Sequence, residues 1–257
     1  MAKPANAVDG RPDSYLICAT PRTGSSLLCG LLESTGVAGH PESYFRQPDE
    51  PAWAARWGIL SSPDSTFSYA DYVRAAITTG KTGNGVFAAR IMWGTLGEVI
   101  DKLATIHPDF AGSDGGLLNR AFGHTRFIYL RRGDVLAQAV SWLRAEQSNV
   151  WFRTEQAQHK ESERGAYFDF DQIRKLVQLI DEHNAAWQRW FTSAGILPHL
   201  IQYEELDAHP VGITRSVLDF LGLELPAGRE ILARHRRLAD ELTAQWIDRY
   251  RGEVLDR

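Results

Sequence analysis

The sequence predicts an α/β domain in which helices flank a parallel sheet on both faces. Four short apolar runs, separated by longer stretches with helical periodicity, point to this architecture. Each run is nearly continuous in apolar residues, as in strands that are buried on both faces. The runs lie at residues 15–19, 86–92, 127–130 and 199–203. With 257 residues, the chain is long enough to bury a substantial core.

Helices are expected between these strands. After Ala19 the chain reads TPRTGSS and then LLCGLLESTG, which predicts a turn and a helix that ends at Gly36. Further helices are predicted at 69–79, 96–106, 135–147 and about 169–193, with two more near 211–221 and 229–240. Residues 1–13 read as a flexible lead-in rich in Pro, Gly and Asp. We therefore expect a single domain over residues 14–257.

Composition argues against several classes of protein. The net charge of −4 does not suit a nucleic-acid binder, which needs a broad basic face. The first residues lack the apolar block of a signal peptide, and no run approaches the roughly 20 apolar residues of a membrane span. We expect a cytoplasmic protein without integral membrane contact. Cys18 and Cys29 are too few for a disulfide framework and are predicted to be buried thiols.

The turn after the first strand is predicted to bind an anion. Unpaired backbone N–H groups at a helix N-terminus carry partial positive charge, and hydroxyls add hydrogen-bond donors. Arg22, Thr23, Gly24, Ser25 and Ser26 bring a guanidinium and three hydroxyls to this turn. The GxxxxGK[ST] pattern of a Walker A loop is absent. An ordinary turn with a serine N-cap is the alternative interpretation.

A second strand, basic turn and helix follow in FIYLRRGDVLAQAVSW. Asp134 is placed to cap the helix, and Arg132 with Ser141 would suit a second phosphate. A surface arginine pair before a capped helix is the alternative. Two such units in one chain favour a ligand with anions at both ends, such as a nucleotide with separate phosphates.

Several segments resemble a known superfamily. TPRTGSSLL, IYLRRGDVLAQAVSW and QYEELDAHPVGITRSVLDFLGL are similar to three motifs of sulfotransferases that use 3′-phosphoadenosine 5′-phosphosulfate (PAPS): the 5′-phosphosulfate loop, the 3′-phosphate strand–loop–helix and the Tyr-Glu-Asp-Leu segment. GVAGHPESYF, NGVFAARIMW and RLADELTAQWIDRYR resemble the bacterial trehalose 2-sulfotransferase-like family. These stretches span residues 15 to 251, nearly the whole chain.

The resemblance implies a P-loop-like sulfotransferase fold and an activity. PAPS would be the sulfuryl donor and 3′-phosphoadenosine 5′-phosphate the product, with no metal. The acceptor would be a hydroxyl of a carbohydrate or glycolipid, and the protein would be a homodimer. Transfer would proceed by in-line displacement, in which positioning and charge stabilisation dominate.

The resemblance also implies the residues that bind the donor. Those around the 5′-phosphosulfate would be Arg22, Thr23, Gly24, Ser25 and Ser26, with Arg22 stabilising charge on the leaving phosphate. Arg132 and Ser141 would hold the 3′-phosphate, although mammalian-type enzymes separate this pair by eight positions and the gap here is nine. Tyr203 would contact the adenine region, and Arg237 would reach the phosphates from the C-terminal segment. Arg90 stands where trehalose-type enzymes carry Lys, which suggests a phosphosulfate or acceptor contact.

The general base is the point at which the sequence departs from the family. Trehalose-type enzymes carry a Glu before two aromatic residues, whereas here HPESYF places Ser43 at that position. Glu42 is displaced by one residue, and His40 precedes it by two. A serine hydroxyl is not basic at neutral pH, so Glu42 is the first candidate for the catalytic base and His40 the second. The alternatives are a solvated loop carboxylate and a turn residue before Pro41.

Two other functions stay open at this point, as do the roles of the tryptophans and of residues 151–164. A P-loop-type nucleotide kinase shares the fold class, and a non-catalytic protein that binds a nucleotide bisphosphate would explain the missing Glu. Tryptophans could stack on a sugar ring or pack in the core; they include Trp53, Trp57, Trp93, Trp142 and Trp151. Residues 151–164 read as an exposed lid or interface segment, or as a solvated charged face.

Overall fold

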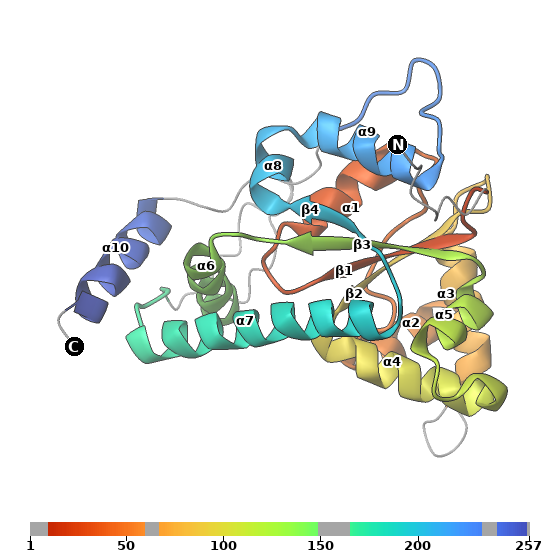
Figure 1. The fold of residues 1–257 in the computed structure, drawn as a ribbon, viewed down its shortest axis with the longest axis horizontal. Helices are drawn as coiled ribbons and strands as arrows, with labels where there is room; N and C mark the ends of the chain where they lie inside the picture. Colours follow the sequence, from red (N-terminus) through yellow and green to blue (C-terminus); the bar gives the residue numbers. More distant parts are fainter. Residues whose placement is uncertain (1–9, 60–66, 149–164, 233–240, 256–257) are drawn as a thin grey trace, which may run out of the picture.

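A four-stranded parallel sheet forms the centre of the molecule (Figure 1). The computed structural model describes residues 10–59, 67–148, 165–232 and 241–255, and within them the strand order is β2-β1-β3-β4. The strands are β1 (Ser14–Ala19), β2 (Phe87–Met92), β3 (Thr125–Arg131) and β4 (His199–Gln202). The four predicted strands are confirmed to within two residues at each end. Tyr203, expected to end the last strand, is instead the first residue of a helix.

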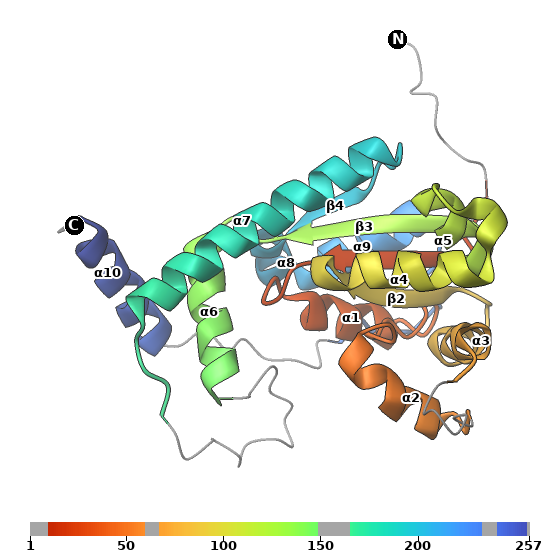
Figure 2. The same cartoon turned by 90° about the horizontal axis from the view of Figure 1, so that it is seen from below.

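Helices cover both faces of the sheet, as predicted (Figures 1 and 2). On one face lie α1 (Ser25–Ser34), α8 (Tyr203–Ala208) and α9 (Pro210–Leu221). The other face carries α2 (Glu50–Arg56), α3 (Tyr69–Gly80), α4 (Trp93–Ile106), α5 (Asp114–Phe122) and α7 (Phe170–Ser193), with short 3₁₀ turns at Gln47–Asp49 and Pro108–Phe110. Beyond the carboxyl ends of the strands lie α6 (Val135–Ser148) and α10 (Glu241–Leu255). None of the helices in the described ranges is both long and apolar enough to cross a bilayer.

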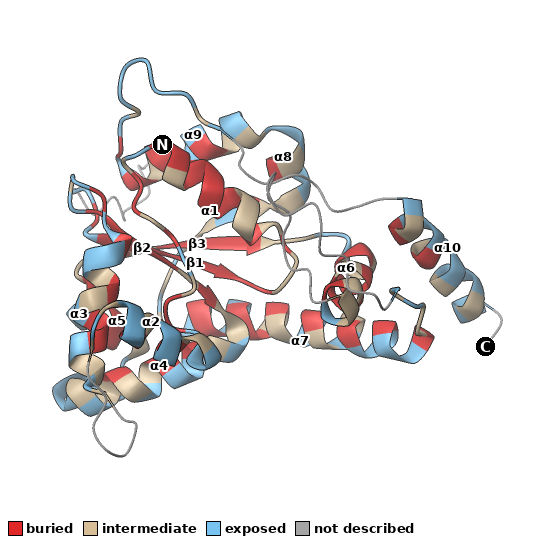
Figure 3. Ribbon diagram, turned by 180° about the vertical axis from the view of Figure 1, so that it is seen from behind, coloured by how far each residue is buried: buried red, intermediate tan, exposed pale blue. Residues whose placement is uncertain are grey.

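The sheet separates two apolar cores. Leu16 and Cys18 of β1 pack into the cluster under α2, α3, α4, α5 and α7. Tyr15 and Ile17 pack into the cluster beneath α1 and α9, because successive strand residues point to opposite faces. Every residue of β1 is buried (Figure 3), which explains its continuous apolar sequence. A third cluster joins α6, α7 and α10 through residues that include Trp246.

Capping residues explain where several helices begin and end. The Asp169 side chain accepts from the Gln172 N–H at 3.0 Å at the start of α7. α9 ends at Gly222, whose φ of 65° is left-handed. Four helices were not predicted from the sequence: α2, α5, α8 and α10. The helix predicted at 229–240 is wrong over 229–232, which are not helical, and the remainder lies outside the described residues.

The topology brings the loops after β1 and β3 together. β1 pairs with β2 on one side and with β3 on the other, so the direction of chain progression reverses at β1. In open α/β sheets, ligands bind at the carboxyl ends of the strands where this reversal occurs. The two predicted anion loops both lie at this edge, one before α1 and the other before α6.

Candidate active site

The turn between β1 and α1 is left-handed at two residues. Arg22 has φ 67°, an unusual value for a residue with a side chain, and Gly24 has φ 81°. Gly24 is the N-cap of α1; no side-chain hydrogen bond caps this helix and its first turn holds no acidic residue. The amino end of α1, in this described part of the chain, is therefore open to an anion.

Tyr203 lies between the two loops. A Cβ atom on Gly24 would lie 2.5 Å from Tyr203 Cδ2, so only glycine leaves room for the ring. The guanidinium carbon of Arg132 lies 4.5 Å from the centroid of the same ring, which is cation–π distance. Tyr203, predicted to lie near the adenine, thus contacts residues predicted for both ends of the donor.

Arg22 and Ser141 are in direct contact. Arg22 Nε donates to Ser141 Oγ at 3.0 Å, although the two residues are 119 positions apart. Burial lowers the pKa of the Arg22 guanidinium to about 10, with further lowering by the charges of Arg132 and Arg144. Arg22 stays protonated at neutral pH, and three arginines gather here in a chain whose net charge is −4. Such a concentration of positive charge is the field that a multiply charged anion requires.

Gln138 on α6 supports the first loop. Its side chain is fully buried, and Nε2 donates to Thr20 Oγ1 at 2.8 Å and to the Pro21 carbonyl at 2.6 Å. The Thr23 hydroxyl donates to the Thr20 carbonyl at 2.9 Å, so it is engaged within the loop. The predicted contact of Thr23 with the sulfuryl donor stays a prediction. No role for Gln138 was predicted from the sequence.

Arg90 on β2 joins the α1 end to the segment that follows α1. Its Nη1 donates to Ser26 Oγ at 2.9 Å and to Ser25 Oγ at 3.4 Å, while Nε donates to Ser43 Oγ at 2.9 Å. The backbone N–H of Arg90 donates to the Glu42 carbonyl at 2.9 Å. Ser43, at the position where the family was expected to carry Glu, is thus a hydrogen-bond partner of Arg90.

A cavity of about 120 Å³ opens next to Arg90. The residues that line it are Ser26, Cys29, Gly30, Glu33, His40, Pro41, Glu42 and Arg90. Both candidate bases therefore reach the same cavity as a serine of the first loop. Throughout the described ranges, no three His, Cys, Asp or Glu side chains are grouped as a metal site would need.

His40 is held in place from three directions. Its Nδ1 lies 3.3 Å from Glu33 Oε1, its backbone N–H donates to the Gly80 carbonyl at 2.8 Å, and its carbonyl accepts from Tyr44 Oη at 2.7 Å. A carboxylate at Nδ1 favours the tautomer that carries its proton there and leaves Nε2 as an acceptor. Glu33 was not identified from the sequence, because no known motif pairs a Glu with a His seven positions later.

The environment of Cys29, which lines this cavity, disfavours the thiolate form. Burial raises the pKa of Cys29 to about 12, with Glu42 and Glu33 adding to the effect and Arg90 opposing it. The thiol is protonated at neutral pH, whereas thiol chemistry requires the thiolate. Cys18 and Cys29 are both free and buried, which confirms the prediction of buried thiols.

Glu204 closes the turn between β3 and α6. Its carboxylate oxygens accept from the Gly133 N–H at 3.1 and 3.2 Å and from the Asp134 N–H at 3.1 Å. Asp134 Oδ1 in turn accepts from the Ala137 N–H at 2.8 Å, which confirms Asp134 as the cap of α6. Glu204 was not singled out from the sequence.

Most of the described tryptophans pack against other aromatic rings. Trp53 and Trp57 stack at 5.2 Å in an aromatic cluster, and Trp93 meets the buried Trp187 edge-on at 5.1 Å. Trp142 donates to Glu146 Oε1 at 2.8 Å. These contacts fit the core interpretation. Trp151, residues 151–164 as a whole and Arg237 lie outside the described residues.

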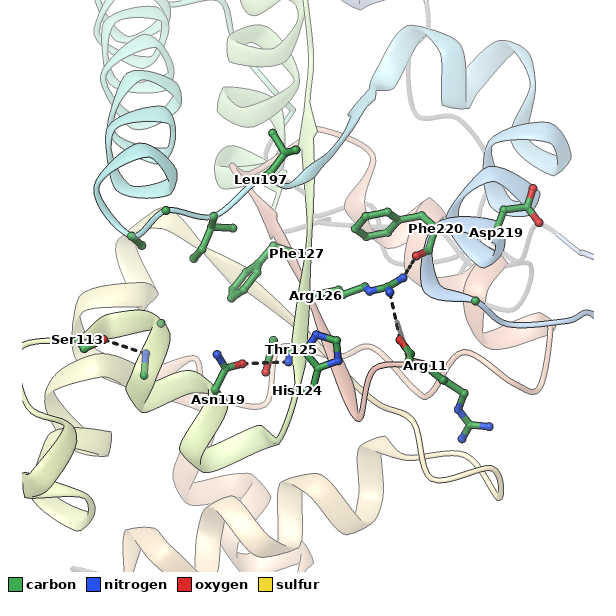
Figure 4. A pocket seen from close by; sticks show the side chains of 17 residues that line it. Arg11, Ser113, Asn119, His124, Thr125, Arg126, Phe127, Leu197, Asp219 and Phe220 are labelled. Atoms are coloured by element: carbon green, nitrogen blue, oxygen red, sulfur yellow. Dashed lines mark hydrogen bonds between the residues drawn. The ribbon is translucent and has the colours of Figure 1, made fainter. Parts of the chain in front are cut away.

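A larger cavity of about 980 Å³ lies at the opposite, amino edge of the sheet (Figure 4). Arg126 and Arg11 reach it, but Arg126 donates to the carbonyls of Phe220 and Gly10, and Arg11 donates to the Asn84 carbonyl. These guanidinium groups donate to backbone carbonyls, whereas the guanidinium groups of a preformed anion site would point their donors toward the ligand. The carboxyl edge is therefore the candidate active site.

The chain matches known proteins over almost its full length. The family model for the Stf0 sulphotransferase matches residues 14–253. Trehalose 2-sulfotransferase of Mycobacterium tuberculosis (strain Erdman) is 30% identical over 93% of this chain and 95% of its own. The enzyme of the same name from Mycolicibacterium smegmatis is 29% identical over 95% and 96%. A solved sulfotransferase structure from Alicyclobacillus acidocaldarius is 12% identical, with a TM-score of 0.49 over 95% of this chain and 92% of that one. On the family model and the first of these relatives, the chain belongs to the Stf0 sulfotransferase family.

Proposed function

We propose that this enzyme transfers a sulfuryl group from PAPS to a hydroxyl of a carbohydrate or glycolipid. The observation that carries the proposal is the contact between Arg22 of the first loop and Ser141 of α6, the helix that follows the second loop. This contact supports a single donor that would span both loops with its two phosphates. Membership of a sulfotransferase family supports the reaction class. Two relatives named for trehalose support a carbohydrate acceptor.

The donor would lie across both loops. The open amino end of α1 would hold the 5′-phosphosulfate together with Arg22, Ser25 and Ser26. Arg132 and Ser141 would hold the 3′-phosphate, and the ring of Tyr203 would lie against the nucleoside. Arg237 remains a predicted phosphate contact. When bound, the donor supplies the sulfuryl group and leaves as 3′-phosphoadenosine 5′-phosphate.

The transfer needs a base and positive charge at the cavity. We propose that Glu42 accepts the proton of the attacking hydroxyl, while a new bond forms between that oxygen and sulfur and the bond from sulfur to the 5′-phosphate oxygen breaks. Arg90 lies between Ser26 of the donor loop and Ser43, so its charge would stabilise the transferring sulfuryl oxygens. Arg22 would stabilise the charge that develops on the leaving phosphate. Guanidinium groups and helix amides supply the positive field, so the proposed mechanism invokes no metal.

His40 is the second candidate base because Glu33 holds its Nδ1. In this orientation Nε2 would take the proton, and the Glu33 carboxylate would stabilise the imidazolium that forms. Glu42→Gln and His40→Gln variants separate the two assignments. The variant that lacks the true base should turn over about 10²–10⁴-fold more slowly than the wild type, with little change in donor affinity. The other variant should show a much smaller decrease in turnover.

Calorimetry with 3′-phosphoadenosine 5′-phosphate and AMP tests the donor proposal. The bisphosphate should bind at least about tenfold more tightly, because a charge-assisted hydrogen bond contributes about 1.5–3 kcal/mol. Arg132→Ala should remove most of this preference. Equal affinities for the two nucleotides would contradict the proposal. Hydrolysis of ATP would favour the kinase alternative, and tight bisphosphate binding without transfer to any carbohydrate would favour a non-catalytic role.

The remaining expectations from the family resemblance are proposals too. We propose a cytoplasmic location, where a nucleotide donor is available, and a homodimer. Neither depends on the identity of the sugar.

A further inference from the structure

Two of the helices that begin at the carboxyl edge of the sheet, α1 and α6, differ in how their amino ends are capped. α1 begins at Gly24 without a side-chain cap and without an acidic residue in its first turn. At α6, the N–H groups of Gly133 and Asp134 already donate to Glu204, and that of Ala137 donates to Asp134. Two carboxylates of the chain itself thus occupy two amides of the turn before α6 and one amide of its first turn.

A phosphate placed on the amides of α6 would meet these carboxylates. Like charges at hydrogen-bonding distance repel, and the positive end of the α6 dipole is already compensated. Burial alone would raise the pKa of Glu204, but hydrogen bonds from the Asp134, Glu204 and Gly133 amides and the charge of Arg132 lower it overall. Glu204 is therefore a carboxylate at neutral pH. An anion at this end of the site must then be held by side chains.

Tyr203 and Glu204 are adjacent residues at the start of α8, and each contacts the turn that carries Arg132. Tyr203 places its ring under the guanidinium of Arg132, and Glu204 holds the amides of the next two residues. The same Tyr203 ring limits position 24 to glycine on the first loop. The start of α8 thus sets the position of the Arg132 turn relative to the α1 loop.

We infer that Glu204 is a positioning residue for the 3′-phosphate of the donor: it occupies the amides of the turn before α6 and fixes that turn, so that Arg132 and Ser141 recognise this phosphate through their side chains. This inference rests on the proposed function, which places the 3′-phosphate at these residues. It assigns a role to a residue that need not touch the donor.

Calorimetry on Glu204→Gln tests the inference, with Glu205→Gln as the matched control. Glu204 and Glu205 are both exposed residues of α8. Among the contacts described for these two residues, only those of the Glu204 side chain reach the turn between β3 and α6. Glu204→Gln should weaken binding of 3′-phosphoadenosine 5′-phosphate about tenfold, since charge-assisted hydrogen bonds to the turn are lost. AMP, which lacks the 3′-phosphate, should bind both variants and the wild type within a factor of about two. The ratio of the two affinities is a readout that a general loss of stability would not move.

Different results would contradict the inference and the proposed function. Bisphosphate binding by Glu204→Gln that equals or exceeds that of the wild type would overturn the inference, as would an equal loss for both nucleotides. A wild-type protein that does not prefer the bisphosphate would overturn the proposed function and the inference with it. If thermal melting shows that Glu204→Gln does not fold, Glu204→Asp is measured instead. The shorter side chain of aspartate keeps the charge but cannot reach both amides, so affinity for the bisphosphate should again fall while affinity for AMP does not. Unchanged affinity for the bisphosphate in this variant would overturn the inference.

Discussion

At the scale of single residues, the site depends on backbone conformations that few residues adopt. Arg22 and Gly24 both have left-handed φ values, and together they turn the chain from β1 into α1. For Arg22 this conformation carries a cost of about 1–2 kcal/mol, which its contacts must offset. Gly24 avoids that cost and also leaves space for Tyr203. Strain of this kind is tolerated where function requires one geometry.

Gly24→Ala is expected to damage the site more than it damages the fold. The new methyl group would overlap Tyr203 Cδ2 and move the ring away from its place between the loops. We expect at least about tenfold weaker bisphosphate binding, equivalent to 1.4 kcal/mol or more. Calorimetry and thermal melting measure the two effects separately.

Gly58→Ala provides the control for this substitution. Gly58 has φ 68°, so alanine there meets the same backbone strain, but nothing lies within 4 Å of its Cβ position. Both variants should lose about 1–2 kcal/mol of stability, and only Gly24→Ala should lose donor affinity. Equal donor affinity in the two variants would contradict the role given to Tyr203.

At the scale of elements, α6 serves both loops at once. Its Ser141 accepts from Arg22, its Gln138 donates to Thr20 and Pro21, and the turn before it carries Arg132. The packing of α6 against α7 and α10 in the third apolar cluster holds these side chains at the edge of the sheet. A shift of α6 would therefore disturb both ends of the donor site together.

Gln138→Leu tests this coupling between helix and loop. The leucine fills similar space but leaves the Pro21 carbonyl without its buried donor, which costs about 1–3 kcal/mol. We expect lower thermal stability and weaker binding of both the bisphosphate and AMP, because the loop that holds the common 5′-phosphate loses its support.

Gln147→Leu is the matched control on the same helix. Gln147 Nε2 donates to the Tyr167 carbonyl at 3.0 Å and Oε1 accepts from the Tyr167 N–H at 2.9 Å, so these bonds join α6 to the segment before α7 and not to the two loops. Their loss should leave nucleotide affinity unchanged within about a factor of two. If Gln138→Leu binds nucleotides as well as Gln147→Leu does, α6 does not support the loop in the way proposed.

At the scale of the whole molecule, an acidic chain concentrates positive charge at one place. The strand order brings the ends of β1 and β3 together, and with them Arg22, Arg132 and Arg144. Arginines at the amino edge instead bind backbone carbonyls. Topology rather than net charge therefore determines where an anionic donor would bind.

The homodimer is a prediction at this same scale. Sedimentation equilibrium should give a mass of twice the 28.8 kDa of the chain at micromolar concentration. Specific interfaces commonly bury about 1,200–2,000 Å² in total, and with an interface of that size we expect the dimer to form at micromolar concentration. A monomer that is fully active in sulfuryl transfer across the tested concentrations would contradict the proposal.

Local sequence by itself determined the strands, most helices and the two turns that carry basic and hydroxyl residues. These features depend on neighbours within a few positions: apolar runs, the glycine after a strand, and Asp134 three residues before the amide that it caps. Cys18 and Cys29 were also predicted correctly, because apolar neighbours in a strand and helix imply burial.

Only the tertiary structure decided which side chains meet. Arg22 bonds Ser141 across 119 positions and Gln138 reaches Thr20 across 118, so no local pattern could have paired them. The same holds for Glu204 on the α6 turn and for Ser43 beside Arg90. Hydrogen bonds act over about 3 Å in space without regard to distance along the chain, and it is the packing of helices on the sheet that brings these partners within that range.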